Sequence, residues 1–247
     1  MNIQDSTALV TGANRGIGKA FADALLDRSA AKVYAAVRDV ATVTDPRLVP
    51  IQLDVTDPDR VAAVARELDD VQVVVNNAGV LHVGTPLSGS LDTARVELET
   101  NYLGLVSMTQ AFAPVLERNG GGAFVNMLSV FSWVSSPLIS TYSASKAAAW
   151  SFTNAARIEL RRQGTQVLGV HAGPVDTEMT AAIDLEKIPP ATVATSALDA
   201  LEADEPEAVV DDYSRAVKAG LSDDQDTLYP QVERQFLELT GAGTAAT

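Results

Sequence analysis

The chain has 247 residues, a formal net charge of −14 and no cysteine, and these facts exclude several classes of protein. A charge this negative disfavours nucleic acid as a partner, because binding phosphates needs a basic face. Without cysteine there are no disulfides, no thiolate nucleophile and no cysteine-ligated zinc. The two histidines, His82 and His171, are too few for a histidine-rich metal site. We therefore expect neither nucleic acid nor a metal to bind.

The apolar segments are too short to cross a bilayer. Examples are 73–75 and 123–125, far below the roughly 20 residues that a membrane helix requires. The first ten residues, MNIQDSTALV, lack the basic stretch and apolar core of a secretion signal. We expect a cytoplasmic protein without a membrane partner.

Apolar runs recur along the chain, each followed by a segment of helical periodicity, which is the pattern of repeated βαβ units. The predicted strands are 7–10, 32–37, 49–53, 71–75, 123–127 and 166–170. The predicted helices are 17–28, 58–68, 92–118 and 141–163. Because right-handed crossovers join such strands, we predict an α/β fold: a Rossmann-like, doubly wound parallel sheet in a single three-layer α/β/α domain. Ligands are expected at the carboxyl ends of its strands.

The pattern becomes less regular after residue 170. A polar, proline-containing stretch covers 177–194, and a helix is predicted around 206–219. We expect residues 1–240 to form one domain, with a substrate lid around 177–220. The last residues, GAGTAAT at 241–247, have little to bury and are expected to form a mobile tail.

The first predicted strand runs directly into T-G-A-N-R-G-I-G, with glycines at 12, 16 and 18. Glycine lets the backbone turn sharply and approach a pyrophosphate, whose charge is held by free N–H groups and the positive end of a following helix. The spacing differs from the general G-x-G-x-x-G fingerprint. Such a turn could simply connect a strand to a helix, but its place at the first βα turn favours dinucleotide binding.

Arg38 directly follows the second predicted strand, twenty residues after Gly18, where an acidic residue would hydrogen-bond the ribose of NAD. An arginine here, together with Arg15, suits the 2′-phosphate of NADP. Arg38 could also be a solvated surface charge, and the adjacent Asp39 keeps NAD(H) open. We predict that NADP(H) is preferred and that NAD(H) is possible.

Tyr142 and Lys146 lie four positions apart near the start of a predicted helix, so they share one face. Reduction of a ketone needs a proton donor, and oxidation of an alcohol needs a base. We expect Lys146 and an oxidised nicotinamide to lower the pKa of Tyr142 from about 10 to about 7, which corresponds to about 4 kcal/mol. Ser129 follows the fifth predicted strand, where its hydroxyl could orient the substrate oxygen. Y-x-x-x-K alone is a weak motif; its placement makes it informative.

Together these motifs resemble the short-chain dehydrogenase/reductase family in its compact single-domain form. The resemblance covers about the first 180 residues. The matching elements are T-G-A-N-R-G-I-G at 11–18, L-D-V-T-D at 53–57, N-N-A-G at 76–79, Asn101, Ser129 and Y-S-A-S-K at 142–146.

The resemblance implies a role for each matching residue. The implied catalytic residues are Ser129, Tyr142, Lys146 and Asn101. Asn101 would hold a water in a proton relay through Lys146, which would also bind the nicotinamide ribose. Asp54 would contact the adenine, and Asn76 with the following Ala-Gly turn would support the central strand and the cofactor. Without the resemblance, Asp54 could merely cap a turn and Asn101 could satisfy helix backbone. The predicted cofactor-binding residues are Gly12, Asn14, Arg15, Gly16, Ile17, Gly18, Arg38, Asp54, Val55, Asn77, Ala78, Gly79, Tyr142, Lys146, Gly173, Val175 and Thr177.

Two features depart from the family pattern. Where the family usually has Pro-Gly after the sixth strand, this chain has Ala172 and Gly173, followed by Pro174. Thr177 still matches the threonine that would approach the nicotinamide carboxamide. The family's usual last strand, ending in Asp-Gly-Gly, is missing. Because that strand commonly supports tetramer contacts, we expect a homodimer through the two long central helices, with a tetramer as the alternative.

We predict an NADP(H)-dependent oxidoreductase that transfers a hydride between nicotinamide and a carbonyl or secondary alcohol, of the carbonyl reductase or alcohol dehydrogenase type. Tyr142 would be its general acid and base. The alternatives are a non-catalytic NADP-binding redox sensor or scaffold, and an epimerase or dehydratase with no net use of nicotinamide. S-A-S-K also matches the S-x-x-K motif of serine acyl-transfer enzymes, but the companion motifs S-D-N and K-T-G are absent from the sequence.

The small-molecule substrate is the least determined part of the prediction. Apolar residues flank the predicted site and suggest an apolar or aromatic substrate, although such residues more often pack cores or loops. They are Phe131, Trp133, Val134, Leu138 and Met179. His82 could touch the substrate or face solvent.

Overall fold

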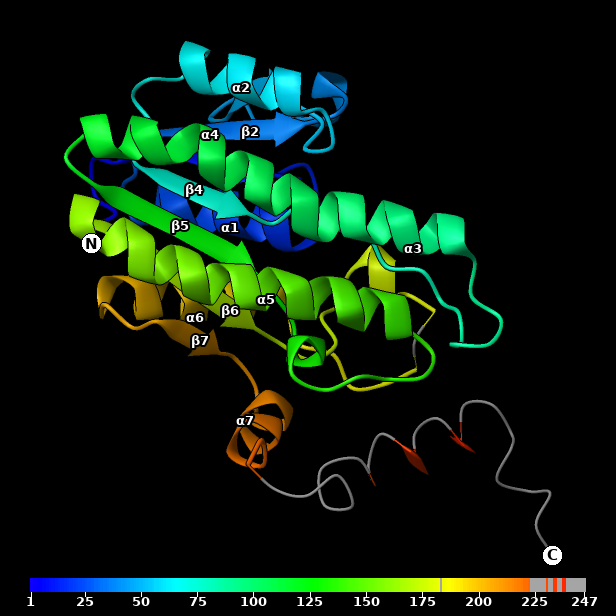
Figure 1. Ribbon diagram of the computed structural model, residues 1–247. Helices are drawn as coiled ribbons and strands as arrows, with labels where there is room; N and C mark the ends of the chain where they lie inside the picture. The colour runs from blue at the N-terminus through cyan, green and yellow to red at the C-terminus, as the bar shows by residue number, and fades with distance from the viewer. Residues whose placement is uncertain (183, 223–229, 231–232, 235–236, 239–247) are drawn as a thin grey trace, which may run out of the picture.

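Seven parallel strands form one sheet in the order β3-β2-β1-β4-β5-β6-β7 (Figure 1). The structure is a computed structural model that describes residues 1–182, 184–222, 230, 233–234 and 237–238. The strands are β1 (Thr7–Thr11), β2 (Lys32–Val37), β3 (Val49–Gln52), β4 (Val73–Asn76), β5 (Gly122–Met127), β6 (Thr165–His171) and β7 (Glu207–Val209). The chain first builds outward from β1 to β3 and then crosses to β4. This switch point places a ligand site at the carboxyl ends of the strands.

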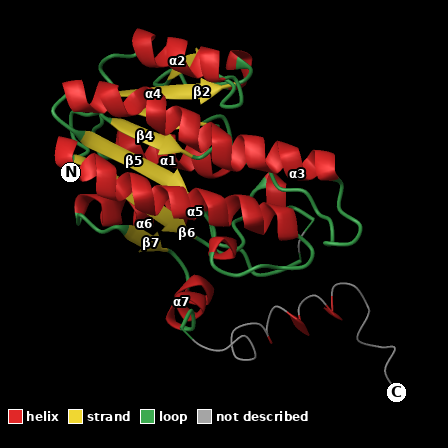
Figure 2. Cartoon of the chain, viewed as in Figure 1, coloured by secondary structure: helices red, strands yellow, loops and turns green. Residues whose placement is uncertain are grey.

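Helices cover both faces of the sheet (Figure 2). One face carries α1 (Gly16–Asp27) and α6 (Pro190–Glu202), which pack against each other. The other face carries α2 (Pro58–Glu67), α4 (Gly104–Arg118) and α5 (Ser140–Leu160). Each face has its own apolar core. The predicted three-layer α/β/α architecture is confirmed.

The central strands are continuous apolar runs because helices cover them on both faces. All four residues of β4, Val-Val-Val-Asn, are buried. Val73 and Val75 enter the core beneath α1, while Val74 enters the core beneath α4, as the two-residue period of a strand requires. Helix α2 begins as its sequence predicts, since the side chain of Asp57 accepts a hydrogen bond from the Arg60 N–H at 2.9 Å.

The helix expected over 92–118 contains one wide turn. α3 (Leu91–Leu98) continues through a π-helical turn, Glu99–Leu103, into α4. Such turns occur frequently at functional sites. Asn101 is the buried residue of this turn, so the wide turn carries the asparagine that the sequence singles out.

The C-terminal part departs from the sequence prediction. α6 occupies part of the stretch expected to be irregular, and its Pro190, which suggests a break, instead starts the helix. The helix expected over 206–219 begins only at α7 (Asp212–Ala219), because residues 207–209 form the edge strand β7. A three-residue strand is too short to show a reliable alternating pattern. Within the expected lid, α6 and β7 thus belong to the core, and a lid stays a prediction for 177–189.

Two further expectations concern the ends of the chain and the bilayer. The expected tail at 241–247 lies outside the described residues. None of the helices in the described part of the chain is long and apolar enough to cross a membrane.

Candidate active site

The glycine loop between β1 and α1 has a backbone that only glycine readily adopts. Gly12 and Gly16 have φ angles of +68° and +52°, in the left-handed region. A Cβ on Gly18 would lie 2.2 Å from the Gly12 carbonyl oxygen, so the loop and the helix can meet only with glycine at this position. The side chain of the N-cap residue Arg15 makes no capping hydrogen bond, and the first turn of α1 carries no acidic residue. The N–H groups of this turn therefore suit a phosphate ligand.

The N-N-A-G segment after β4 is fastened to the end of β1. The Thr11 hydroxyl accepts hydrogen bonds from the N–H groups of Asn77 and Ala78, both at 2.9 Å, and Asn77 Nδ2 donates to the Thr11 carbonyl at 2.8 Å. Asn76 is buried and donates to Asn126 Oδ1 on β5 at 2.9 Å. The segment thus joins three neighbouring strands directly beneath the expected cofactor.

The two arginines expected at the 2′-phosphate differ in their surroundings. Arg38 is exposed at the end of β2 and forms no ion pair with any residue that the structure describes. The adjacent Asp39 accepts a hydrogen bond from its own turn, from Ala41 N–H at 3.0 Å. Arg15, in contrast, pairs with Glu178, and both side chains are exposed. Arg38 is available to a phosphate, whereas Arg15 would have to exchange partners.

Asp54 follows β3 and caps the turn there. Its Oδ1 accepts hydrogen bonds from the N–H and the hydroxyl of Thr56 at 3.0 and 2.8 Å. The bond from the Thr56 N–H is the main cause that holds the pKa of Asp54 below its usual value, and Arg38 adds to the effect. Asp54 therefore caps the turn, as the alternative interpretation expected. Its contact with the adenine stays a prediction. The neighbouring Val55 is buried against Gly104, where a Cβ would lie 2.8 Å from Val55 Cγ2.

Four residues at the centre of the site come from three segments that end or begin near one another. Ser129 follows β5, Asn101 lies in the π-helical turn, and Tyr142 and Lys146 lie on α5. Lys146 Nζ lies 5.8 Å from the centre of the Tyr142 ring and donates to the Met127 carbonyl at 2.8 Å. The structure therefore places the tyrosine and the lysine on one helical face, as expected.

Asn101 holds the loop after β4 in place. Its Oδ1 accepts from Val80 N–H at 2.8 Å, and its Nδ2 donates to the Val80 carbonyl and to Ser145 Oγ, both at 2.9 Å. The backbone that it satisfies is therefore a loop and not a helix. A cavity of about 10 Å³ lies beside it, lined in part by Thr11, Asn101 and Lys146. This volume suits about one water molecule.

Burial shifts the pKa of the tyrosine and of the lysine in opposite directions. It raises the pKa of Tyr142 to about 12; a hydrogen bond with Ser129 opposes this shift, and the charge of Glu97 reinforces it. Burial lowers the pKa of Lys146 to about 8. The expectation that Lys146 lowers the pKa of Tyr142 is wrong as far as the protein's own side chains are concerned. The loss of solvent around the phenol raises its pKa by more than the other effects change it.

The loop after β6 is held in place by hydrogen bonds, although Ala172 and Gly173 stand where the family usually has Pro-Gly. The Gly173 N–H donates to Asp211 Oδ2 at 2.8 Å, and the Pro174 carbonyl accepts from Ile188 N–H at 2.9 Å. Val175 is buried. Thr177 lies against the glycine loop, where a Cβ on Gly16 would be 3.2 Å from Thr177 Cγ2.

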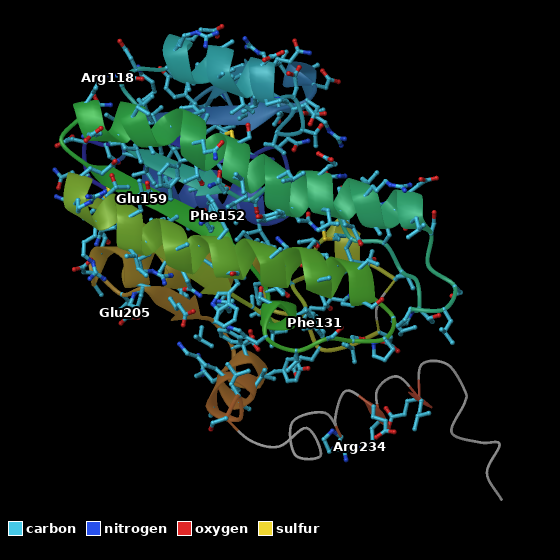
Figure 3. The ribbon with its side chains drawn as sticks, in the orientation of Figure 1. Arg118, Phe131, Phe152, Glu159, Glu205 and Arg234 are labelled. Carbon is cyan, nitrogen blue, oxygen red and sulfur yellow. The ribbon has the colours of Figure 1, made fainter. Side chains whose placement is uncertain are left out.

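The residues expected to flank the substrate divide into two groups. Val134 is buried in the core, and Trp133 stacks on His171 with ring centroids 3.8 Å apart. Phe131, beyond the carboxyl end of β5 (Figure 3), is half-buried, and Met179 is exposed. Leu138 is also half-buried. Trp133 is half-buried as well, so exposed apolar surface remains at four of the five positions, all except Val134.

Two buried ionisable residues beside the site belong to none of the sequence motifs. Glu97 on α3 is fully buried, and its Oε1 accepts the His82 N–H at 2.7 Å. His82 is therefore tied to α3, with a partly exposed side chain. His171, the last residue of β6, is also fully buried. The sequence contains a signal that could have identified each of these residues. Glu97 precedes Asn101 by one helical turn, and His171 ends a strand whose carboxyl end faces the site.

Comparison with known proteins gives consistent matches. Residues 6–188 match the family model of the short chain dehydrogenases. Galactitol 2-dehydrogenase of Agrobacterium fabrum is 33% identical over 196 residues, which cover 74% of this chain and 76% of that protein. Estradiol 17-beta-dehydrogenase 2 of Rattus norvegicus is 32% identical over 199 residues, which cover 74% of this chain but 51% of that protein. The chain thus matches about half the length of that relative.

A solved structure is similar over nearly the whole chain. It is a short chain dehydrogenase from Burkholderia cenocepacia in complex with NADP, with a TM-score of 0.90 and 38% sequence identity. The match covers 94% of this chain and 99% of that one.

Proposed function

This chain belongs to the short-chain dehydrogenase family, and on that basis we propose that it is an oxidoreductase that reduces a carbonyl compound with NADPH, using Tyr142 as the proton donor. The observation that carries the proposal is the burial of Tyr142 beside Ser129 and Lys146 at the carboxyl end of the sheet. With a pKa of about 12, the phenol keeps its proton at neutral pH. That is the form a reductase needs.

The residues at the edge of the sheet fit a nicotinamide dinucleotide. The left-handed glycines and the free first turn of α1 suit a pyrophosphate. The unpaired Arg38 suits a 2′-phosphate, and the similar structure from Burkholderia cenocepacia holds NADP. We therefore prefer NADP(H) to NAD(H) for this chain.

NADPH, when bound, supplies the hydride to the carbonyl carbon. The Ser129 hydroxyl orients and polarises the carbonyl oxygen, and Tyr142 gives its proton to the alkoxide that forms. Lys146, whose pKa burial lowers and whose Nζ lies 5.8 Å from the centre of the Tyr142 ring, can then return a proton to the phenolate. Asn101, beside the small cavity, connects Lys146 to a site large enough for water. The products are an alcohol and the oxidised nucleotide.

The test is Tyr142→Phe, which removes the hydroxyl and keeps the ring. We expect turnover of a reducible carbonyl to fall by at least about 100-fold, with the Kd for NADPH changed by less than about 3-fold. Tyr34→Phe is the matched control, because the Tyr34 hydroxyl bonds Asp70 and Lys32 outside the site.

The same assay separates the alternatives. A redox sensor or scaffold would bind NADPH and turn over none of the ketones, aldehydes and quinones offered. An epimerase or dehydratase would change its substrate without a stoichiometric loss of NADPH absorbance. Either result would contradict the proposal.

The half-buried Phe131 and Leu138 and the exposed Met179 favour an apolar or aromatic carbonyl substrate. A screen of such compounds with NADPH and NADH measures this preference. A homodimer through α4 and α5 and a cytoplasmic location stay predictions.

A further inference from the structure

The carboxyl group of Glu97 is buried close to Tyr142 and uses only one of its two oxygens. Glu97 lies on α3, and its side chain is fully buried. Its Oε1 accepts the His82 N–H at 2.7 Å, whereas its Oε2 has no hydrogen-bond partner among the residues that the structure describes. Burial is the main cause that raises the pKa of Tyr142, and Glu97 adds to the rise. The carboxyl group therefore lies within electrostatic reach of the phenol.

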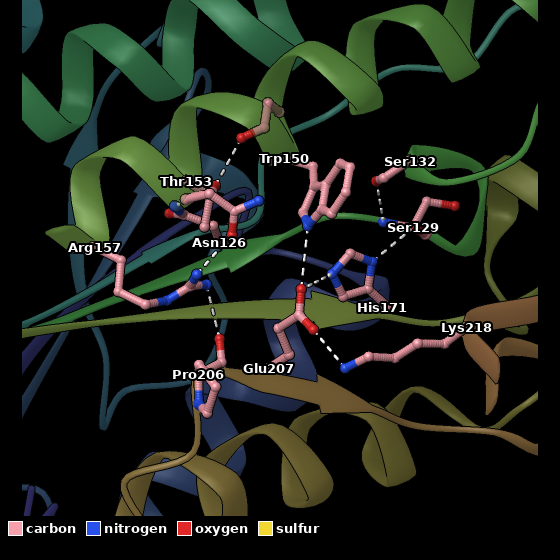
Figure 4. A network of polar contacts seen from close by, with 12 residues as sticks. Asn126, Ser129, Ser132, Trp150, Thr153, Arg157, His171, Pro206, Glu207 and Lys218 are labelled. Atoms are coloured by element: carbon pink, nitrogen blue, oxygen red, sulfur yellow. Dashed lines mark hydrogen bonds and ion pairs between the residues drawn. The ribbon is translucent and has the colours of Figure 1, made fainter. Parts of the chain in front are cut away.

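The surroundings of Glu97 differ from those of a buried acid that stabilises a fold. Glu207, at the start of β7, has donors on both oxygens, Trp150 Nε1 at 3.1 Å and Lys218 Nζ at 2.5 Å (Figure 4). A buried carboxyl group with one oxygen unpaired loses solvation that nothing replaces. An apolar side chain in the place of Glu97 should therefore cost the fold little. Stability does not explain the acid at this position.

The hydrogen bond to Glu97 holds the middle of the loop formed by residues 80–84, which follows N-N-A-G. The beginning of the same loop is held by Asn101, four positions after Glu97. Asn101 binds both the N–H and the carbonyl of Val80, at 2.8 and 2.9 Å. Two side chains on one side of the helix thus bind the loop, one at Val80 and one at His82.

The end of this loop is joined to the start of α5, which carries Tyr142. The Gly84 N–H donates to the Leu138 carbonyl at 2.8 Å, and Gly84 forms a bridge with Ile139. The Ile139 carbonyl in turn accepts the Ser143 N–H and hydroxyl at 2.9 and 3.0 Å. Leu138 is one of the half-buried apolar residues expected at the substrate. Its position therefore depends on how the loop is held.

The ring of His82 is directed by the same carboxyl group. Its Nδ1 is buried without a hydrogen bond, 3.6 Å from Glu97 Oε1, while the side chain is 40% exposed. The ring thus turns its Nδ1 edge toward α3 and leaves its opposite edge accessible.

We propose that Glu97 is a positioning residue that, by accepting the His82 N–H, holds the loop 80–84 as a wall of the substrate pocket next to Leu138. The inference rests on the proposed function for its effect on substrate binding, but the hydrogen bond itself can be measured without any turnover. Glu97 touches neither substrate nor cofactor in this account and acts through the loop.

The kinetic test compares two side chains of nearly equal length at this position. In Glu97→Gln the amide oxygen can still accept the His82 N–H, whereas Glu97→Met offers only a weakly accepting sulfur. We expect Glu97→Met to raise the KM for the carbonyl substrate about 10-fold, which is the equivalent of one lost hydrogen bond. Its kcat and its Kd for NADPH should stay within about 3-fold of the wild type, because only substrate binding is lost. All three constants of Glu97→Gln should stay within the same range.

The control variant is Glu99→Met, because Glu99 is exposed two residues further along the chain, and its KM should equal that of the wild type. The Tm of Glu97→Met should stay within about 4 °C of the wild type, which separates positioning from stability. An unchanged KM in Glu97→Met would overturn the positioning role, as would an equal rise of KM in Glu97→Gln. If both Glu97→Met and Glu97→Leu failed to fold, Glu97 would serve stability, and the role would also be overturned.

Hydrogen exchange of the His82 amide, followed by NMR, tests the anchor without turnover. The chain contains only two histidines, so isotopic labelling of histidine gives two backbone amide signals, and His82→Asn identifies that of His82. We expect this amide to exchange slowly in the wild type and in Glu97→Gln, and at least about 10-fold faster in Glu97→Met. Rapid exchange in the wild type, or equal exchange in all three proteins, would overturn the anchor. If the wild type reduces no carbonyl, the proposed function fails, while the exchange result still decides the anchor.

Discussion

Replacing Lys146 by methionine should stabilise the fold at neutral pH while abolishing turnover. The side chain is 5% exposed, and its pKa falls from 10.5 in the free state to about 8 in the protein. That difference corresponds to about 3 kcal/mol that disfavours folding while the ammonium is charged. Methionine removes this cost but leaves the Met127 carbonyl without its donor, a loss of about 1 kcal/mol. The net gain is about 2 kcal/mol, or roughly 4–8 °C in Tm.

The sign of the effect changes with pH in a defined way. Below pH 8 lysine is charged in both the folded and the unfolded chain, so the wild type carries the whole cost. Between pH 8 and pH 10.5 only the unfolded chain keeps the proton, and the wild type becomes more stable as the pH rises. The advantage of Lys146→Met should therefore be largest near pH 7 and disappear by about pH 10.

Denaturant unfolding followed by tryptophan fluorescence at pH 7 and pH 9.5 measures both free energies. Lys19→Met is the control, because Lys19 is exposed and paired with Asp23, and a surface change of this kind is expected to stay within about 0.5 kcal/mol at either pH. A variant of Lys146 that is no more stable than the wild type at pH 7 would refute the reasoning, as would a gain that does not depend on pH.

Two further predictions concern the arginines at the cofactor site. Arg38→Ala should raise the KM for NADPH by about 10-fold to 100-fold, the value of a charge-assisted hydrogen bond, and leave the KM for NADH nearly unchanged in initial-rate assays; equal changes for both nucleotides would exclude a 2′-phosphate contact. Glu178→Gln should lower the Kd for NADPH about 2-fold to 5-fold in a fluorescence titration, because it frees Arg15 from an exposed ion pair worth at most about 1 kcal/mol. An unchanged or higher Kd would mean that Glu178 does not compete for Arg15.

The parts of the fold that the sequence predicts are those determined by local pattern. β4 is a run of valines, and only a strand covered on both faces needs such a run. α2 begins at an Asp-Pro pair that caps it. The catalytic pair is equally local, since Tyr142 and Lys146 share a face simply because they are four residues apart. The same reasoning fails at β7, whose three residues become a strand only because β6 offers them an edge.

The parts that could not be predicted depend on partners distant in the sequence. Arg15 and Glu178 meet only after the loop following β6 returns over the glycine loop. The pKa of Tyr142 depends on burial by surrounding elements and not on its neighbour in the motif. His171 carries no motif at all, and its position beside Glu207, 3.4 Å from its Nε2, follows only from the pairing of β7 with β6.

The buried side chains of Lys146 and His171 both lie at the carboxyl end of β5. Lys146 Nζ donates to the carbonyl of Met127, the last residue of β5, and His171 Nδ1 lies 3.0 Å from the Ser129 carbonyl, which also accepts the Ser132 N–H. A neutral donor would satisfy the Met127 carbonyl equally well, so hydrogen bonding alone does not explain why a lysine occupies this position. A positive charge has a further effect, because it stabilises negative charge that develops on an alkoxide nearby. Lys146 therefore both completes the end of the strand and favours the proposed reaction, and a neutral donor in its place should preserve the strand end better than it preserves the rate.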